Sequence, residues 1–392
     1  MATFSFLPSP MPGHVNPTLA VARELTRRGH EVLYHLPESY GRQVRETGAG
    51  LHPIRVAPPE RYADPLTRFA MFPVWLAKAA ESVLPEVIDR LGDTRPDVIL
   101  YDQTCVWGRL LSKIMPGPAA QFVPTYVSNE HFSLMNSPRY APIRERLAPA
   151  FAEIVPPLDR LNRTFGLTAR PHELFARDEE LVLVIMPRAF HPAGETFGAP
   201  FVFVGSSIDL AAPADRRLLE RIAPGRRVVY ISFGTVMSLS PELVDTVCKA
   251  FADDVWQVVL SLGDYTPALT LPGNVIAAPS VPQLDVLRAA DAFVTHGGVN
   301  SAVESIAAEV PMVVLPLTPE HAVTADQVAA LGLGTRLDAS GTTPEALREA
   351  VDHVARSASI RRAVSGMRRA LEVDGGYRAA ADALAAVAGD RS

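Results

Sequence analysis

The loop at residues 296–301 has the residue types of an anion-binding site. It follows a short apolar run at Ala292–Thr295 and reads His-Gly-Gly-Val-Asn-Ser. The glycines let the backbone turn sharply and approach a ligand closely, and the amides at the start of the helix expected next would face a negative charge. His296, Asn300 and Ser301 add neutral hydrogen-bond donors. A diphosphate would fit this loop; the alternative is an ordinary glycine turn with Asn300 or Ser301 as the helix cap.

A carboxylate follows this loop on the same expected helix. Glu304 lies about one turn beyond Ser301, near the positive end of the helix dipole. A carboxylate in that position can accept hydrogen bonds from two sugar hydroxyls, as acidic residues do in other nucleotide sites. The competing interpretation is a first-turn glutamate that the dipole alone favours.

A histidine near the amino terminus could act as a general base. His14 stands beside Gly13 in the loop after an apolar run at Thr3–Leu7. A neutral imidazole can take a proton from an alcohol if a carboxylate holds its other ring nitrogen. Asp102 is the candidate partner because it ends another apolar run, at 96–102. A surface or capping histidine is the competing interpretation.

The elements around His14 indicate a parallel sheet. Thr3–Leu7 and Glu31–Leu36 have the sequences of buried strands. Between them we expect a helix that has Asn16 as its N-cap and Pro17 in its first position. A strand, a helix and a second strand in this order form a βαβ unit, which is typical of parallel sheets.

The same alternation continues along the chain. Further apolar runs that we expect to be strands, separated by helical or turn sequence, lie at 96–102, 181–186, 201–205, 228–233, 255–262, 292–295 and 312–315. We predict two doubly wound α/β domains, at 1–205 and 227–376, because the polar stretch 206–226 reads as a linker. Ligands of open parallel sheets bind beyond the carboxyl ends of the strands, so two such domains imply a cleft.

Composition excludes several classes of protein. The 392 residues include 37 Lys and Arg against 43 Asp and Glu, a net charge of −6, and 48% of them are hydrophobic. A disordered chain would have fewer apolar residues, and a nucleic-acid-binding chain would usually be basic. No apolar run reaches the roughly 18 residues of a membrane span, and the amino terminus lacks the pattern of a signal peptide. We expect a soluble, cytoplasmic protein.

The positions of the cysteines and the absence of several sequence motifs argue against several kinds of site. Cys105 and Cys248 lie far apart in the sequence, so we expect neither a disulfide framework nor a cysteine metal site. The chain has no Asp-x-Asp and no spaced His/Cys cluster, which argues against a metal held by the protein. It also lacks the dinucleotide fingerprint, the P-loop and the nucleophile elbow of serine hydrolases.

Several further motifs occur in a fixed order along nearly the whole chain. They are PGHVNP at 12–17, RRGHEV at 27–32, SFGT at 232–235, VPQL at 281–284, ADA at 290–292, THGG at 295–298, PMVV at 311–314 and LGLG at 331–334. With these motifs the chain resembles the family 1 inverting glycosyltransferases of GT-B fold, especially the bacterial branch that glycosylates macrolides and related small lipophilic natural products. The resemblance implies two Rossmann-like domains that face a central cleft, with a carboxyl-terminal helix at 377–392 packing back on the first domain.

The resemblance also implies roles for the candidate residues. His14 would deprotonate the acceptor hydroxyl, and Asp102 would orient the ring. The donor would be a nucleoside-diphosphate sugar, most readily UDP-linked, which is a co-substrate rather than a cofactor. The residues that the resemblance assigns to the donor are Thr235, Ser280, Val281, Gln283, His296, Gly298, Val299, Asn300, Ser301, Glu304, Glu320 and His321.

The resemblance implies that different residues of this donor set bind different parts of the nucleotide. The loop at 296–301 would bind the diphosphate together with Thr235, and Glu304 would bind the ribose. The backbone of Val281 and the side chain of Gln283 would contact the base and the ribose edge. No metal would be needed, because helix amides and neutral donors would meet the charge on the leaving group.

Two positions depart from the family's pattern. Ser280 stands where many relatives have an aromatic side chain that stacks on the base, and such stacking contributes roughly 1–3 kcal/mol in other systems. Glu320 and His321 stand where many users of UDP-glucose have Asp and Gln. We therefore expect differently built base recognition. A longer carboxylate and an imidazole can still bind sugar hydroxyls, so the expected sugar is glucose or a related hexose, and these two residues leave open that it is not glucose.

The acceptor is the least readable substrate. Aromatic and sulfur side chains gather in the first domain, and those chosen as acceptor contacts are Phe72, Trp75, Phe132 and Met135. Membership of the core is the competing interpretation for each of them. Together they indicate a lipophilic acceptor such as a macrolide or polyketide.

The predicted function is therefore inverting transfer of a sugar to a hydroxyl of a small natural product, by a monomer or homodimer that binds no nucleic acid. A TDP-deoxysugar-dependent transferase of antibiotic biosynthesis is the first alternative. A nucleotide-sugar epimerase or hydrolase of the same fold and a non-catalytic helper protein are the others.

Overall fold

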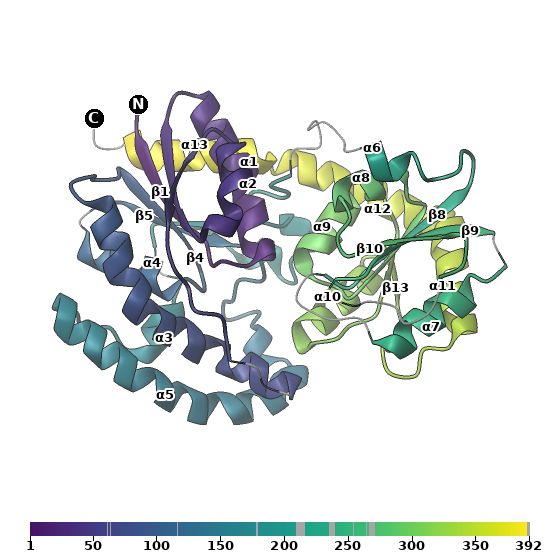
Figure 1. The fold of residues 1–392 in the computed structure, drawn as a ribbon, viewed down its shortest axis with the longest axis horizontal. Helices are drawn as coiled ribbons and strands as arrows, with labels where there is room; N and C mark the ends of the chain where they lie inside the picture. The colour runs from purple at the N-terminus through teal and green to yellow at the C-terminus, as the bar shows by residue number, and fades with distance from the viewer. Residues whose placement is uncertain are drawn as a thin grey trace. The chain divides into compact units, whose positions relative to one another are not determined.

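The fold is taken from a computed structural model of the chain. It describes residues 1–60, 62, 64–115, 117–177, 179–208, 216–234, 240–253, 255–263, 265 and 271–389. These residues form two compact units, each built on its own parallel sheet (Figure 1). The predicted fold class, two doubly wound α/β domains, is confirmed.

The division between the units differs from the predicted boundaries. The first unit comprises Met1–Ile185, Glu195–Ile208 and Gly375–Ser392, and the second comprises Met186–Gly194 and Asp209–Asp374. The segment Met186–Gly194 belongs to the second unit. A hydrogen bond attaches it there, because the Arg188 amide donates to the Asp374 carboxylate at 3.0 Å. Nothing in its local sequence marks this exchange.

The first unit has a seven-stranded, wholly parallel sheet. Its strands are β1 (Thr3–Leu7), β2 (Glu31–Leu36), β3 (Gly50–Pro53), β4 (Val98–Asp102), β5 (Ala119–Val123), β6 (Leu181–Val184) and β7 (Phe201–Phe203). The order across the sheet is β3-β2-β1-β4-β5-β6-β7. Because β1 and β4 are neighbours, the loop after β1 and the end of β4 share the carboxyl edge of the sheet.

Helices cover both faces of this sheet, as continuous apolar strands require. They are α1 (Pro12–Arg27), α2 (Gly41–Arg45), α3 (Pro65–Leu91), α4 (Val106–Ile114), α5 (Ala141–Phe165) and α13 (Gly376–Gly389). Alternate residues of β4 enter two separate cores. Tyr101 packs with α3, α4 and α5, whereas Leu100 packs with α1 and α13.

The carboxyl-terminal helix α13 is part of the first unit and lies beside α1 (Figure 1). Ala380, Ala381 and Leu384 are fully buried in the core that contains α1. Small alanine side chains allow this close approach of two helices. An ion pair of 2.5 Å between Arg28 and Asp382 adds a polar contact at the edge of the helix pair.

The predicted start of α1 is wrong. Asn16 is not an N-cap and Pro17 is not the first helical residue, because the helix already begins at Pro12. Pro12 suits the first position as well as Pro17 does, and Pro17 is accommodated inside the helix. The consequence for chemistry is that His14 sits in the first turn of α1 rather than in a loop.

The second unit has a six-stranded parallel sheet with the order β10-β9-β8-β11-β12-β13. Its strands are β8 (Arg227–Ser232), β9 (Trp256–Ser261), β10 (Val275–Ala278), β11 (Ala292–Thr295), β12 (Met312–Val314) and β13 (Gly334–Arg336). Its helices are α6 (Arg216–Leu219), α7 (Pro241–Ala250), α8 (Gln283–Ala289), α9 (Val299–Ala307), α10 (Pro319–Ala330), α11 (Pro344–Arg356) and α12 (Ala358–Val373).

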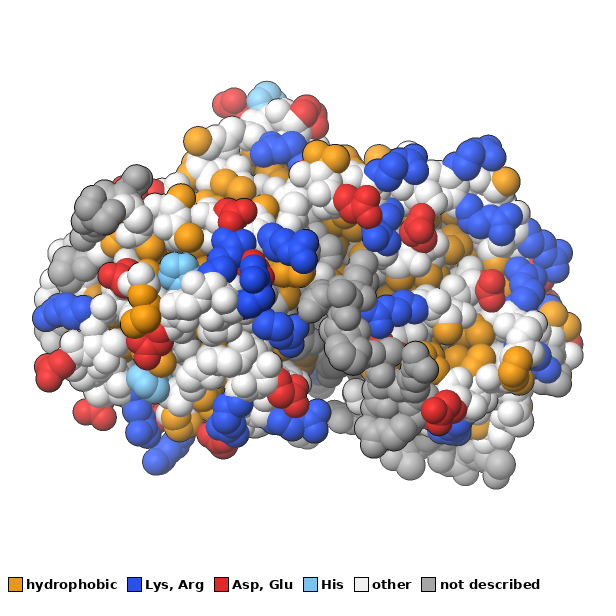
Figure 2. All heavy atoms as spheres, turned by 90° about the horizontal axis from the view of Figure 1, so that it is seen from above, with side chains coloured by type: hydrophobic (Ala, Val, Ile, Leu, Met, Phe, Trp, Pro, Cys, Tyr) orange, Lys and Arg blue, Asp and Glu red, His pale blue; other side chains and the backbone are white. Residues whose placement is uncertain are grey.

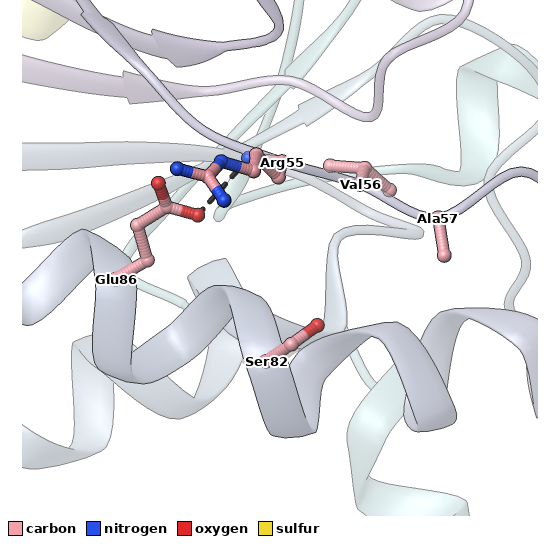
Figure 3. Close-up of a pocket in the computed structure, with 5 residues that line it drawn as sticks. All are labelled: Arg55, Val56, Ala57, Ser82 and Glu86. Atoms are coloured by element: carbon pink, nitrogen blue, oxygen red, sulfur yellow. Dashed lines mark hydrogen bonds between the residues drawn. The ribbon is translucent and has the colours of Figure 1, made fainter.

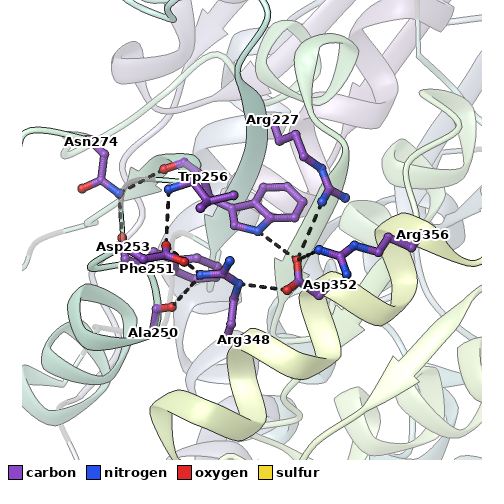
Figure 4. A network of polar contacts seen from close by, with 10 residues as sticks. Arg227, Ala250, Phe251, Asp253, Trp256, Asn274, Arg348, Asp352 and Arg356 are labelled. Atoms are coloured by element: carbon purple, nitrogen blue, oxygen red, sulfur yellow. Dashed lines mark hydrogen bonds and ion pairs between the residues drawn. The ribbon is translucent and has the colours of Figure 1, made fainter.

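A polar network closes the amino edge of this second sheet (Figure 4). Asp352 of α11 accepts from the Trp256 indole and the Arg348 guanidinium, each at 3.1 Å. Arg227 lies 3.8 Å from the same carboxylate and stacks 4.2 Å above the Trp256 ring. Because β8 and β9 begin at Arg227 and Trp256, this network lies at the edge opposite the strand ends that carry ligand loops.

The surface carries both signs of charge. On the face shown in Figure 2, Asp and Glu side chains are scattered among Lys and Arg side chains, and several of the basic side chains lie next to one another. Among the helices of the described residues, none has the length and apolar character needed to cross a membrane.

Candidate functional site

His14 and Asp102 form a close pair in the first unit. His14 lies in the first turn of α1, and Asp102 is the last residue of β4. The distance from His14 Nδ1 to Asp102 Oδ2 is 2.6 Å, the length of a strong charge-assisted hydrogen bond. With the proton on Nδ1 facing the carboxylate, Nε2 carries the lone pair that a general base needs.

The carboxylate of this pair is buried and held from its other side. Asp102 is 1% exposed, whereas the His14 side chain is 21% exposed. The Thr104 amide and hydroxyl donate to Asp102 Oδ1 at 2.7 and 2.5 Å, and the Ser9 hydroxyl bonds to Thr104 at 2.8 Å. A fixed anion facing a partly exposed imidazole is the arrangement that orients a base toward a substrate.

His296 occupies a tight position in the second unit. It follows β11 and is 8% exposed. A Cβ atom on Gly298 would lie 2.7 Å from His296 Nε2, and one on Gly234 would lie 3.0 Å from the same ring. Burial lowers the pKa of His296 to about 4, while a hydrogen bond to the Ser232 backbone opposes this shift. The ring is therefore neutral at pH 7, a hydrogen-bond donor without a charge.

The start of α9 lies directly after this histidine. Gly298 is at the N-cap position and has no side chain to cap the helix. Because α9 begins at Val299, Asn300 and Ser301 lie inside the helix and neither serves as the N-cap. The first turn of α9 contains no acidic residue. The helix dipole and the first amides thus remain suited to an anion. Gly297 has a φ of +89°, which a glycine adopts without strain.

Three predicted donor residues meet in one hydrogen-bonded group. Gln283, the first residue of α8, donates from Nε2 to Glu304 Oε2 at 2.5 Å and lies 3.4 Å from the Ser301 hydroxyl. Its carbonyl oxygen accepts from the Tyr230 hydroxyl at 3.1 Å. Tyr230 is on β8 and stacks on Phe293 with a centroid distance of 4.9 Å. The structure therefore joins residues from α8, α9 and β8.

Glu304 has an unusual proton affinity. Burial raises its pKa from 4.5 to about 7, and the hydrogen bond from Gln283 only partly offsets this. A carboxyl group that titrates near neutrality can both donate and accept hydrogen bonds, which suits contact with sugar hydroxyls. Sequence analysis finds the residue but not this shift.

The shifted pKa predicts a pH-dependent stability. In the folded chain Glu304 holds its proton up to about pH 7, whereas in the unfolded chain it loses it near pH 4.5. The free energy of unfolding should therefore fall as the pH rises from about 4.5 to 7. Glu304→Gln, which stays neutral, should remove about 1–3 kcal/mol of this fall.

Urea unfolding of the wild type and the variant at pH 5, 6, 7 and 8 measures the effect. Glu349→Gln, at an exposed glutamate of the same unit, is the matched control and should leave the pH profile unchanged. Parallel profiles for the wild type and Glu304→Gln would show that Glu304 ionises normally.

Glu320 and His321, two of the three residues that depart from the pattern of the resemblance, lie at the start of α10. The His321 ring meets the His296 ring edge to face, with a centroid distance of 4.5 Å. Burial, and next the neighbouring His296, lower the pKa of His321 to about 3, so both rings are neutral. Thr318 caps α10 by accepting from the His321 amide at 3.2 Å, with Glu320 in the first turn.

The remaining predicted donor residues lie at different elements of the second unit. Ser280 is exposed after β10, and Val281 is half-buried just before α8. Val299 begins α9 and is buried. Thr235 lies outside the described residues.

The predicted acceptor residues all lie in the first unit. Phe72 and Trp75 of α3 lie 5.4 Å apart between ring centroids and pack against the core beneath α3. Phe132 packs on Tyr126 at 5.8 Å, and Met135 is 37% exposed.

A cavity of about 540 Å³ opens beside α3 (Figure 3). Arg55, Val56 and Ala57 line it from the segment after β3, and Ser82 and Glu86 line it from α3. The Arg55 amide donates to the Glu86 carboxylate at 3.0 Å. The predicted acceptor residues do not line this cavity, although the Trp75 indole donates to the Ala57 carbonyl at 2.8 Å.

Three residues that were not predicted from the sequence support the candidate groups. Ser9 and Thr104 hold the Asp102 side chain, and Tyr230 extends the Gln283 group. Thr104 has a recognisable signal, because a threonine two residues after a strand-ending aspartate can donate to its carboxylate. Tyr230 has none, since it lies within an apolar strand. The described residues contain no cluster of three or more potential metal ligands.

Comparison with known proteins gives consistent matches. Residues 197–369 match the protein family described as UDP-glucoronosyl and UDP-glucosyl transferase. The NDP-glycosyltransferase YjiC of Bacillus licheniformis is 33% identical, over 96% of this chain and 95% of that protein. The demethyllactenocin mycarosyltransferase of Streptomyces fradiae is 34% identical, over 98% of this chain and 86% of that protein. The crystal structure of the glycotransferase of kitacinnamycin has a TM-score of 0.83 and 30% identity, over 98% of each chain.

The relatives match along almost the whole sequence, and both parallel-sheet units lie within the matched region. The resemblance drawn from the ordered motifs is thereby confirmed. The chain belongs to the family 1 glycosyltransferases of GT-B fold and is related to macrolide glycosyltransferases.

Proposed function

We propose that the protein is an inverting O-glycosyltransferase that moves glucose or a related hexose from a nucleoside-diphosphate sugar to a hydroxyl of a small lipophilic natural product. The observation that carries this proposal is the 2.6 Å contact between His14 Nδ1 and the buried Asp102 carboxylate. This contact leaves Nε2 of a partly exposed imidazole as the base.

The proposed reaction is a single displacement. His14 Nε2 takes the proton of the acceptor hydroxyl while the oxygen attacks the anomeric carbon, on the face opposite the leaving group. The bond from that carbon to the phosphate oxygen breaks, and its electron pair leaves with the diphosphate. A single displacement of this kind inverts the anomeric configuration. Asp102 stabilises the imidazolium that forms.

The leaving group would meet neutral donors. The start of α9 has no acidic residue and no side-chain cap, and His296 beside it is a neutral donor. Backbone amides and a helix dipole can offset developing negative charge without a metal. We therefore propose that transfer is independent of divalent cations and expect EDTA to leave the rate unchanged.

The donor nucleotide is proposed as UDP, in line with the family description. TDP-deoxysugars are the second candidate, because the mycarosyltransferase relative is named for a sugar other than glucose. The exposed Ser280 offers no aromatic stack to either base. The Gln283, Ser301 and Glu304 group is proposed to bind the ribose of either nucleotide. For the acceptor we propose a macrolide or polyketide, and for the location the cytoplasm.

Mass spectrometry of a substrate panel tests the proposal. UDP- and TDP-sugars are each combined with macrolide, polyketide and flavonoid acceptors, and a product heavier by one sugar is expected for at least one pair. The coupling constant of the new anomeric proton should show inversion. Conversion of the donor alone would instead indicate an epimerase or hydrolase, and no turnover with any pair would favour a helper protein.

A further inference from the structure

Two hydroxyl groups join the loop before α1 to the loop after β4. Ser9 lies between β1 and α1, and the first turn of α1 contains His14. Thr104 lies between β4, which ends at Asp102, and α4. The hydroxyl oxygens of Ser9 and Thr104 are 2.8 Å apart, although the two residues are 95 positions apart in the chain. This contact bridges the carboxyl ends of two neighbouring strands.

The donor in each of these hydrogen bonds follows from the carboxylate at the end of the chain of contacts. An ionised carboxylate only accepts, and the Thr104 hydroxyl lies 2.5 Å from Asp102 Oδ1. The single proton of this hydroxyl is therefore directed at Asp102, and the Ser9 hydroxyl donates to Thr104. Ser9 Oγ also lies 3.5 Å from Oδ1, and the Thr104 amide donates to Oδ1 at 2.7 Å. These donors occupy Oδ1 and leave Oδ2 for His14 Nδ1, at 2.6 Å.

Ser9 is also coupled to the start of α1. Its carbonyl accepts from the amide of Met11, the N-cap residue of that helix, at 2.7 Å. Ser9 is fully buried and Asp102 is 1% exposed, so water has little access to replace a donor that is lost. The contact between the two hydroxyl groups therefore fixes the start of α1, and with it His14, relative to the end of β4.

We propose that Thr104 and Ser9 are positioning residues of the His14–Asp102 pair. Thr104 holds the carboxylate with Oδ2 toward the imidazole, and Ser9 holds Thr104 and the start of α1 at the matching distance. The proposal rests on the proposed function of His14 as the base. Both side chains act through the pair and not on the substrate. Because Asp102 stabilises the imidazolium that forms during transfer, loss of its orientation should lower kcat and leave KM nearly unchanged.

The first test follows the His14 ring by NMR in the full chain without substrates. Above neutral pH, the chemical shifts of the two ring nitrogens report which of them carries the proton, and His14→Gln identifies their signals. In the wild type the proton is expected on Nδ1, facing Asp102. Thr104→Val should shift both signals toward a mixture of the two tautomers, whereas Thr104→Ser, which keeps the hydroxyl, should retain the wild-type shifts.

This readout needs no turnover, so its outcome is separate from that of the proposed function. Ring nitrogen shifts that stay at the wild-type values in Thr104→Val, or in Ser9→Ala if Thr104→Val does not fold, overturn the proposal. Shifts that change in a protein that transfers no sugar would support the positioning role and contradict the proposed function instead.

The second test separates kcat from KM. Thr104→Val should lower kcat by roughly 10–100-fold, because a hydrogen bond to a charged group contributes about that much. Ser9→Ala should lower kcat by less, and the double variant should be no slower than Thr104→Val alone, because the Ser9 hydroxyl acts through Thr104. Thr47→Val is the matched control, since the buried Thr47 hydroxyl donates to the Val44 carbonyl at 2.6 Å in the same unit. It should lower Tm without changing kcat, and an equal fall of kcat in Thr47→Val and Thr104→Val would contradict the proposal.

Discussion

Replacing His14 by alanine is expected to lower the rate of sugar transfer by about 10²–10⁴-fold and to leave binding of the donor nucleotide nearly unchanged, because a positioned general base contributes about that much. The imidazole is the only part of the His14–Asp102 pair that is exposed enough to meet a substrate: its side chain is 21% exposed and that of Asp102 is fully buried. The donor candidates lie on the second unit, so their geometry does not depend on this ring.

Product formation by mass spectrometry and nucleotide binding by calorimetry measure the two expectations separately. His30→Ala is the matched control in the same unit, since His30 accepts from the Ala2 amide at 3.2 Å and packs edge to face on Phe4, away from the His14–Asp102 contact. Asp102→Asn should also slow transfer, and the double variant with His14→Ala should be no slower than His14→Ala alone, because Asp102 acts through the ring. Turnover at the wild-type rate in His14→Ala would refute the assignment of the base.

Truncating Leu384 to alanine is expected to lower the free energy of unfolding of the first unit by about 2–5 kcal/mol. Leu384 is fully buried, near the carboxyl end of the chain, in the core that β1, β2 and β4 share with α1. A cavity there loosens α13 from the sheet of the first unit. Leu384 lies far along the chain from β1, β2 and β4. A loss of stability of the first unit is therefore expected only if α13 packs in the core of that unit.

Tryptophan fluorescence can assign the loss to one unit. Of the three tryptophans, Trp75 and Trp107 lie in the first unit and Trp256 lies in the second. In a Trp256→Phe background the signal reports only the first unit, whose transition should shift to lower denaturant in Leu384→Ala. Val373→Ala, at a side chain that is 85% exposed, is the control and should change stability by about 0.5 kcal/mol or less. An unchanged midpoint of this transition in Leu384→Ala would contradict the expectation.

Local sequence was sufficient where an element is specified by its own residues. Both β1 and β11 have the predicted bounds, because each is a short apolar run bordered by proline or glycine turns. Competing local signals caused the error at α1, where Pro12 and Pro17 both suit a helix start. The place of Met186–Gly194 had no local signal at all, because it depends on Asp374, which lies far along the chain.

The candidate donor residues of the second unit were also only partly predictable from the sequence. The loop at 296–301 was readable because glycines and small donors before a helix carry a local meaning. The pKa values of Glu304 and His321 could not be predicted from the sequence, because each depends on how completely the surrounding elements bury the side chain. Tyr230 joined the group only because β8 and α8 meet in space.

The sequence by itself determined the fold class, the family, and the residue types at the strand ends, because apolar periodicity and ordered motifs are properties of neighbouring residues. The tertiary structure decided which of these residues meet. His14 and Asp102 are 88 residues apart in the chain, and their contact exists because β1 and β4 lie side by side. Burial, charge separation and the place of α13 depend on packing between distant segments, which no local pattern encodes.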